Sequence, residues 1–93
     1  MKPINWNSEK NKQLIESRDL SFEAIVFCLQ SGGLIDDGPH PNKDKYPNQR
    51  LFIVQIDDYA YLVPYVENEE EIFLKTIIPS RKATRQFLGE RNG

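Results

Sequence analysis

The sequence predicts a single α+β domain with two N-terminal helices, an antiparallel sheet of three or four strands and a C-terminal helix. The prediction depends on three observations. Apolar residues recur at helical spacing near the N-terminus, they alternate at strand spacing over most of residues 51–78, and a basic helical segment follows the last strand. At 93 residues the chain has the size of one domain. We therefore expect one domain over residues 1–93, with a proline-rich loop at 38–49.

Two short helices are expected in the first third of the chain. Asn7 or Ser8 can cap a helix that runs to about Arg18, and Ser21 can cap a second helix over Phe22–Gln30. The second helix has the i, i+3, i+4, i+7 spacing of a core-facing helix, in Phe22, Ile25, Val26 and Leu29. Helices this short are marginal alone, so both are expected to pack on the sheet.

The extended segments are predicted at Ile4–Trp6, Leu34–Asp36, Leu51–Ile56, Tyr59–Val66 and Ile72–Ile78. A tight turn at Asp57-Asp58 joins two of them. Alternation predicts that one face of the sheet is core, formed by Phe52, Val54, Ile56, Leu62, Val66, Ile72, Leu74 and Ile78. The opposite, more polar and aromatic face is predicted to carry Tyr59, Tyr61, Tyr65, Phe73 and Lys75. Pro64 cannot donate to a ladder, which indicates a bulge, a bend or an edge.

The last strand is predicted to stop at Pro79, and Ser80 is a good N-cap for a helix that follows it. On a helical wheel, the basic residues Arg81, Lys82 and Arg85 form an arc beside an apolar stripe of Ala83, Thr84, Phe87 and Leu88. Two of the cations fall in the first turn, where the helix dipole mildly disfavours them. Such a basic ridge indicates either function or simple solvation, because exposed charge runs are common.

Charge is unevenly distributed along the chain. The formal net charge is −2. Residues 1–79 hold 8 Lys and Arg against 13 Asp and Glu, whereas residues 80–93 hold 4 against 1. The C-terminal part, which includes Arg91 in a tail expected to fray, can therefore meet a polyanion, while the acidic remainder opposes broad nucleic-acid binding. The single cysteine, Cys28, and the lack of a leader or membrane-length apolar run favour a cytoplasmic protein with no membrane contact.

Most catalytic constellations are missing from the sequence. One His and one Cys exclude the usual zinc clusters, so we expect no metal and no cofactor. His40 is interpreted as a surface histidine. What remains is a basic and aromatic set that could cleave RNA without a metal. The predicted catalytic residues are Arg81, Lys82, Arg85, Lys75 and Tyr65, and the predicted RNA-binding residues are Arg50, Tyr61, Lys43 and Lys45.

Three short stretches occur in the order Trp6–Asn11 (WNSEKN), Phe22-Glu23 and Ile77–Arg85 (IIPSRKATR). Together they resemble the BrnT family of toxins. The family has a W-D-x-x-K-N start, an F-E helix and an I-I-S-A-R-R-A-T-type ending. The resemblance extends from about residue 4 to residue 88.

This resemblance implies a fold like that of the RelE superfamily of ribonuclease toxins, cleavage of free or ribosome-bound mRNA, and inhibition by a cognate antitoxin protein. DNA would be met only indirectly, through that antitoxin. Matched by position, the family's basic cluster corresponds to Arg81, Lys82 and Arg85. The alternative from the residues themselves is a non-catalytic regulatory or binding module of the same fold, acting in a protein complex.

Overall fold

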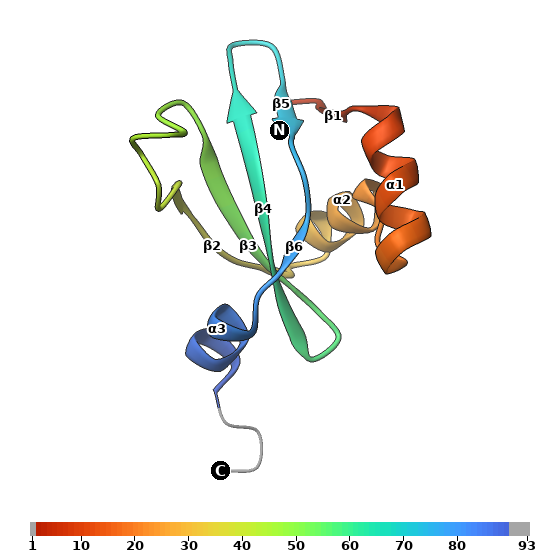
Figure 1. Ribbon diagram of the computed structural model, residues 1–93, viewed down its shortest axis with the longest axis vertical. Helices are drawn as coiled ribbons and strands as arrows, with labels where there is room; N and C mark the ends of the chain where they lie inside the picture. The colour runs from red at the N-terminus through yellow and green to blue at the C-terminus, as the bar shows by residue number, and fades with distance from the viewer. Residues whose placement is uncertain (1, 90–93) are drawn as a thin grey trace.

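A computed structural model describes residues 2–89 of the chain. The α+β class predicted from the sequence is confirmed: three helical segments accompany one mixed sheet (Figure 1). In chain order the elements are β1 (Ile4–Trp6), α1 (Ser8–Arg18), α2 (Phe22–Gln30), β2 (Leu34–Pro39), β3 (Arg50–Ile56), β4 (Tyr59–Glu67), β5 (Ile72–Leu74), β6 (Ile78–Pro79), α3 (Arg81–Ala83) and the π-helical turn η1 (Thr84–Leu88).

The sheet is larger than expected and is not wholly antiparallel. Its strand order is β1-β5-β4-β3-β2, and β6 pairs with β4 beyond the end of β5. The segment at the N-terminus joins the sheet as β1, which pairs with β5 in parallel, Ile4 opposite Ile72. All other neighbours are antiparallel. β1 and β2 are therefore the two edge strands of the main path.

Both N-terminal helices begin at the predicted caps. The Asn7 side chain accepts a hydrogen bond from the Lys10 amide at 2.9 Å, and the Ser21 hydroxyl accepts one from the Ala24 amide at 3.1 Å. Asn11, which is buried, joins the helices: it accepts from the Phe22 amide and donates to Glu23, both at 2.8 Å. The two helices thus pack on the sheet as one unit, on the same side of it (Figure 1).

On α2, Phe22 and Ile25 are fully buried, as predicted, but the rest of the apolar face differs. Val26 and Leu29 are only partly buried, while Cys28 lies in the core. The Cys28 thiol donates to the Gln55 carbonyl at 3.1 Å, and burial raises the pKa of this thiol. A buried, unreactive cysteine is what the sequence indicated. Phe27 is 70% exposed.

The face assignment on β4 was wrong. The two-residue turn at Asp57-Asp58 places Ile56 opposite Tyr59, so that Tyr61, Val63 and Tyr65 share the helix-covered face with Phe52 and Val54. Tyr65 is 1% exposed and stacks on Phe52 at 3.9 Å between ring centroids. Leu62 and Val66, which were predicted to be core, lie on the opposite face and are only partly buried.

A one-residue register shift separates β5 from β6. Tyr65 pairs with Leu74, but Leu62 pairs with Ile78, which places one extra residue in the connecting segment. The shift turns Ile77 into the core at 0% exposure and leaves Ile78 outside at 40%, so the prediction of a buried Ile78 was wrong. Pro64, for which the sequence indicated a bulge or bend, lies at this step and accepts a hydrogen bond from the Lys75 amide at 2.8 Å.

Two further boundaries differ from the expectation. β2 extends to Pro39, so Gly38 and Pro39 belong to a strand and the irregular loop covers residues 40–49. The C-terminal helix is present, but its last part is wound as a π-helical turn, and Phe87 is exposed rather than docked. Within residues 2–89 no helix is both long and apolar enough to cross a bilayer. The predicted Arg91 tail lies outside the described residues.

Candidate functional site

The three basic residues of the predicted C-terminal ridge line one hollow in the structure. Arg81, Lys82 and Arg85 are exposed on α3 and η1, and with Gln86 they line one open hollow of about 460 Å³. We call these four residues the C-terminal basic surface. Its cations are close enough to act on one polyanionic ligand, and guanidinium groups can contact a phosphate through two donors at once.

The backbone beneath this surface is tied to β4. The Ser80 hydroxyl caps the Ala83 amide at 3.0 Å, and the Ser80 amide donates to the Ala60 carbonyl at 3.0 Å. Thr84 completes the attachment: its hydroxyl accepts from the Ala60 amide and donates to the Ser80 carbonyl, each at 2.8 Å. Ala83 is buried against the sheet. A short helical segment that would be marginal alone is in this way held at a fixed place on the sheet.

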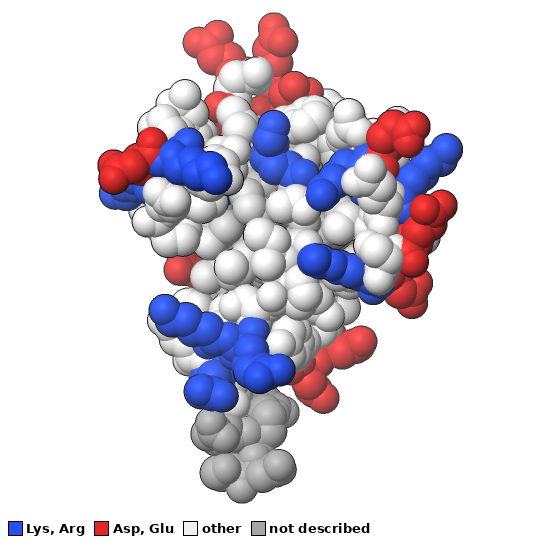
Figure 2. Space-filling model, in the orientation of Figure 1, with Lys and Arg blue, Asp and Glu red and all other residues white. Residues whose placement is uncertain are grey.

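Figure 2 shows a cluster of Lys and Arg side chains where α3 lies and Asp and Glu side chains at the opposite end, with further side chains of both signs spread over the rest of this face. The acidic end is formed by the β4–β5 connection, which carries Glu67, Glu69 and Glu70. Acidic residues also occur close to the basic surface, because Asp57 and Asp58 form the turn just before Ala60, to which this surface is attached.

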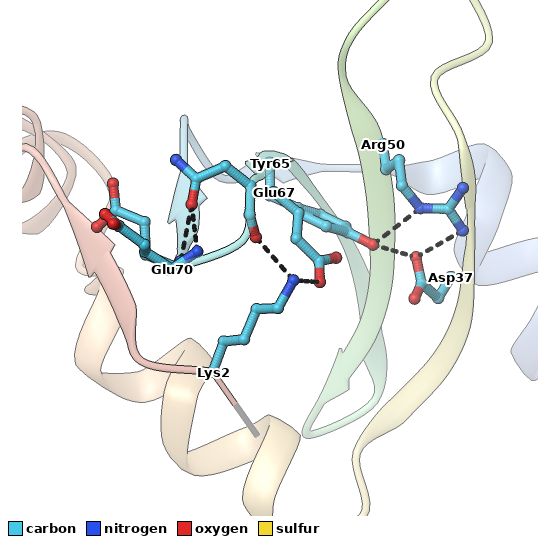
Figure 3. A network of polar contacts seen from close by, with 8 residues as sticks. Lys2, Asp37, Arg50, Tyr65, Glu67 and Glu70 are labelled. Carbon is cyan, nitrogen blue, oxygen red and sulfur yellow. Dashed lines mark hydrogen bonds and ion pairs between the residues drawn. The ribbon is translucent and has the colours of Figure 1, made fainter.

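Tyr65 and Arg50 lie together in a different group (Figure 3). The Tyr65 hydroxyl donates to the Asp37 carboxylate at 2.5 Å and accepts from Arg50 Nε at 3.1 Å. Arg50 also pairs with Asp37 at 3.4 Å. Burial, reinforced by the hydrogen bond to Asp37, raises the pKa of Tyr65 to about 12. The hydrogen bond to Tyr65 raises the pKa of Arg50.

We call Asp37, Arg50 and Tyr65 the strand clasp, because these residues connect three strands: Asp37 is in β2, Arg50 in β3 and Tyr65 in β4. A buried phenol that stays protonated up to such a high pH and is already bound to a carboxylate is a poor proton shuttle at neutral pH. Figure 3 also shows a separate contact at the N-terminus, where Lys2 binds Glu67 at 2.8 Å and the Asn68 carbonyl at 2.7 Å.

The remaining predicted residues lie apart from the C-terminal basic surface. Lys75 is exposed and lines a second hollow, with its ammonium 5.5 Å from the Phe73 ring centroid. Tyr61 packs against the core and meets Tyr59 edge-on at 5.6 Å. Lys43 and Lys45 are exposed on the 40–49 loop. The predicted residues are thus not assembled in one site: they are divided among the basic surface, the strand clasp, the 40–49 loop with the second hollow, and, for Tyr61, the edge of the core.

Two contributing residues were not predicted from the sequence. Asp37 lies opposite Phe52 in the β2–β3 register, and its carboxylate reaches diagonally to Arg50, a contact that is visible only once the register is known. Gln49 was also passed over, and it lines the second hollow together with His40 and Tyr46. In the part of the chain that the structure describes, no group of three or more His, Cys, Asp or Glu side chains is arranged to hold a metal ion.

Comparison of the chain with protein-family models, with curated proteins and with solved structures found no match.

Proposed function

We propose that this chain is the toxin of a type II toxin–antitoxin system and acts as a metal-independent endoribonuclease that binds RNA through the C-terminal basic surface. The observation that supports the proposal most is the convergence of Arg81, Lys82 and Arg85 on one hollow at the end of the molecule. The resemblance of the first, second and last motifs to BrnT toxins, described above, gives the reaction class.

The chemistry requires little beyond such a surface. In metal-independent RNA cleavage the 2′-hydroxyl of the substrate attacks the adjacent phosphorus, and negative charge accumulates on the phosphoryl oxygens. Fixed cations next to those oxygens stabilise the transition state, and the loss of one such donor typically costs about 100-fold in rate. Arg81 is the strongest candidate, because the Ser80 cap and the Thr84 attachment fix its backbone on β4.

No residue is assigned to proton transfer in this proposal. We leave Tyr65 out of the catalytic set because it is buried in the strand clasp. The residues that line the basic hollow are Arg, Lys and Gln, and we assign its guanidinium and ammonium groups to phosphate contact and not to proton abstraction. Lys75, also predicted to be catalytic, carries the same ammonium group and lines the second hollow, so we assign it to phosphate contact as well.

The same observation favours a second candidate function. A basic hollow without a proton acceptor among its described lining residues suits a module that binds a polyanion and does not cleave it. In this alternative the chain is a non-catalytic regulatory or binding subunit of a protein complex. The two functions share the surface and differ only in turnover.

Cleavage of a defined mRNA in the presence of EDTA tests the first proposal. Arg81→Ala is expected to lower the cleavage rate about 100-fold. Arg81→Lys keeps the charge and loses the two-donor fork, so it is expected to recover only part of the rate. The matched control is Lys12→Ala, which removes an exposed cation from α1, far along the chain from the basic surface.

Two outcomes would change the conclusion. RNA that is bound but left intact by the wild-type chain would favour the binding module. Cleavage by Arg81→Ala at the wild-type rate would show that the basic surface is not the catalytic site.

An antitoxin partner follows from the first proposal. We expect it to cover the basic surface with an acidic or amphipathic segment that folds on binding. Because charge sets orientation and association rate more than affinity, the on-rate is expected to fall with added salt. An on-rate that is insensitive to salt and to Arg85→Ala would contradict this placement.

A further inference from the structure

The second hollow lies between the 40–49 loop and the sheet and has a volume of about 390 Å³. From the loop it is lined by His40, Tyr46 and Gln49, and from the sheet side by Pro64, Lys75 and Ile78. We call it the loop pocket. It combines two aromatic rings, one side-chain amide, one cation and an apolar floor.

The loop that forms this pocket is folded by its own hydrogen bonds. The His40 amide donates to the Gln49 carbonyl at 3.2 Å, which closes the loop at its base. The Tyr46 amide donates to the Asn42 carbonyl at 2.9 Å, and the Asn42 amide donates to His40 Nδ1 at 3.0 Å. The rings of His40 and Tyr46 then lie 4.6 Å apart between centroids. A loop that looked merely long and proline-rich in the sequence therefore presents a defined aromatic pair.

The side chains of the loop pocket fit the chemistry of a nucleobase. Unpaired bases stack on aromatic rings, and their edges form hydrogen bonds with groups that both donate and accept. The His40–Tyr46 pair provides the rings, and Gln49 provides an amide with two donors and one acceptor. While His40 Nδ1 accepts from Asn42, the ring proton lies on Nε2, which adds a donor. Lys75 at the wall and Lys45, 5.4 Å from the Tyr46 ring centroid, can meet a phosphate.

We propose that the loop pocket binds one unpaired base of the RNA whose backbone lies on the C-terminal basic surface. This inference rests on the proposed function. The two sites are joined by the chain itself: Ile78 lines the pocket, and β6 leads directly through Pro79 and Ser80 to Arg81. Three residues of extended chain span at most about 10 Å, so a base in the pocket and phosphates on the basic surface can belong to one short strand.

The pocket would give the protein a base preference that the basic surface alone lacks. Contacts to phosphates position a strand without reading it, whereas contacts to base edges read it. Gln49 suits this task because its amide both donates and accepts, and the Tyr46 and Thr76 hydroxyls that line the same pocket add further groups of this kind.

The direct test is an NMR titration of the full chain with each of the four ribonucleoside 5′-monophosphates, with ribose 5-phosphate as the base-free probe. We expect shifts of the Tyr46 and Gln49 amides with at least one nucleotide and not with ribose 5-phosphate. Tyr46→Ala is expected to weaken that binding about tenfold, the size typical for loss of one base-stacking ring. Tyr46→Phe keeps the ring and is expected to bind like the wild type. Tyr59→Ala is the matched control, a tyrosine outside the pocket.

Equal shifts with ribose 5-phosphate, or shifts confined to the basic surface, would refute the proposal that the loop pocket binds a base. A second arm separates the two proposals by measuring fluorescence anisotropy of a short single-stranded RNA and of its abasic counterpart. Tyr46→Ala is expected to weaken only the base-containing RNA, whereas Arg81→Ala weakens both. RNA binding that depends on Arg81 but not on Tyr46 refutes the pocket and leaves the proposed function standing. Nucleotide binding without any RNA binding refutes the proposed function, and with it the RNA assignment of the pocket.

Discussion

The strand clasp gives the sharpest prediction for stability. Tyr65→Phe keeps the buried ring that stacks on Phe52 and removes only the hydroxyl bound to Asp37 and Arg50. A hydrogen bond to a charged group contributes about 1.5–3 kcal/mol. The Asp37 side chain is 38% exposed, so water can partly replace the lost donor. We therefore expect a loss of about 1.5 kcal/mol at pH 7, which is roughly 6–12 °C in Tm for a domain of this size.

The same variant carries a pH signature. The phenol of a tyrosine ionises near pH 10 in an unfolded chain, but the pKa of Tyr65 in the folded protein is raised to about 12, first by burial and then by the bond to Asp37. A raised folded pKa gives stability that is complete below pH 10 and is lost as the pH rises through 12. That loss totals on the order of 2–3 kcal/mol and is missing from Tyr65→Phe. The stability advantage of the wild type is thus expected to vanish near pH 11.

Urea unfolding of both proteins from pH 7 to pH 11.5 measures this difference directly, and absorbance of the phenolate at high pH reports the titration. Tyr61→Phe is the matched control, since Tyr61 lies on the same strand and face but outside the clasp. A constant difference between wild type and Tyr65→Phe across pH 10–11.5 would refute the argument. An unchanged free energy of unfolding at pH 7 would show that the clasp does not stabilise the fold.

Five further substitutions test the packing. Ile77→Ala is expected to cost about 2–4 kcal/mol and Ile78→Ala less than about 1 kcal/mol, because only the first is buried; equal losses in urea melts would contradict the register shift. Gly33→Ala would place a Cβ 2.2 Å from the Cys28 sulfur and is expected to cost more than about 2 kcal/mol, whereas Gly38→Ala meets nothing within 4 Å and is expected to be tolerated in thermal melts. Thr84→Val leaves a strand amide unbound and is expected to cost about 1–3 kcal/mol in urea melts while weakening RNA binding; unchanged binding would show that this attachment does not hold the basic surface.

Local signals in the sequence were sufficient for the helices and their caps. The side chains of Asn7, Ser21 and Ser80 accept hydrogen bonds from backbone amides three residues later, as predicted for N-caps. Such a cap could be predicted because it depends only on residues close in sequence. The convergence of Arg81 and Arg85 on one side was also predictable, since four residues make about one helical turn.

The face of β4 that packs in the core was harder to predict, because both faces of this strand are apolar. Tyr59, Tyr61, Val63 and Tyr65 compete with Leu62 and Val66, and periodicity alone cannot choose between them. The two-residue turn does choose, since it pairs Ile56 with Tyr59. Applying this rule to the sequence would have placed Tyr65 inside. The bulge before β6 has no comparable signal, because it depends on how Ile77 fits the core.

Only the local part of the candidate site could be predicted from the sequence. The basic surface could be, because it is a feature of one helical segment. The loop pocket requires residues from the 40–49 loop to meet Lys75 and Ile78, which no spacing rule reveals. Likewise, the Asp37–Arg50–Tyr65 clasp requires the strand order.

The parallel pairing of β1 with β5 has a consequence for how the chain folds during synthesis. β1 is made well before its partner Ile72–Leu74. Until that partner leaves the ribosome, the stacked rings of Trp6 and Phe22 have no complete sheet to cover them. Contacts between such distant segments form slowly, because the loop that they close is long. The N-terminal helices are therefore expected to pack stably only once β5 has emerged, and α3, which follows β6 and is anchored to β4, is set in place after it.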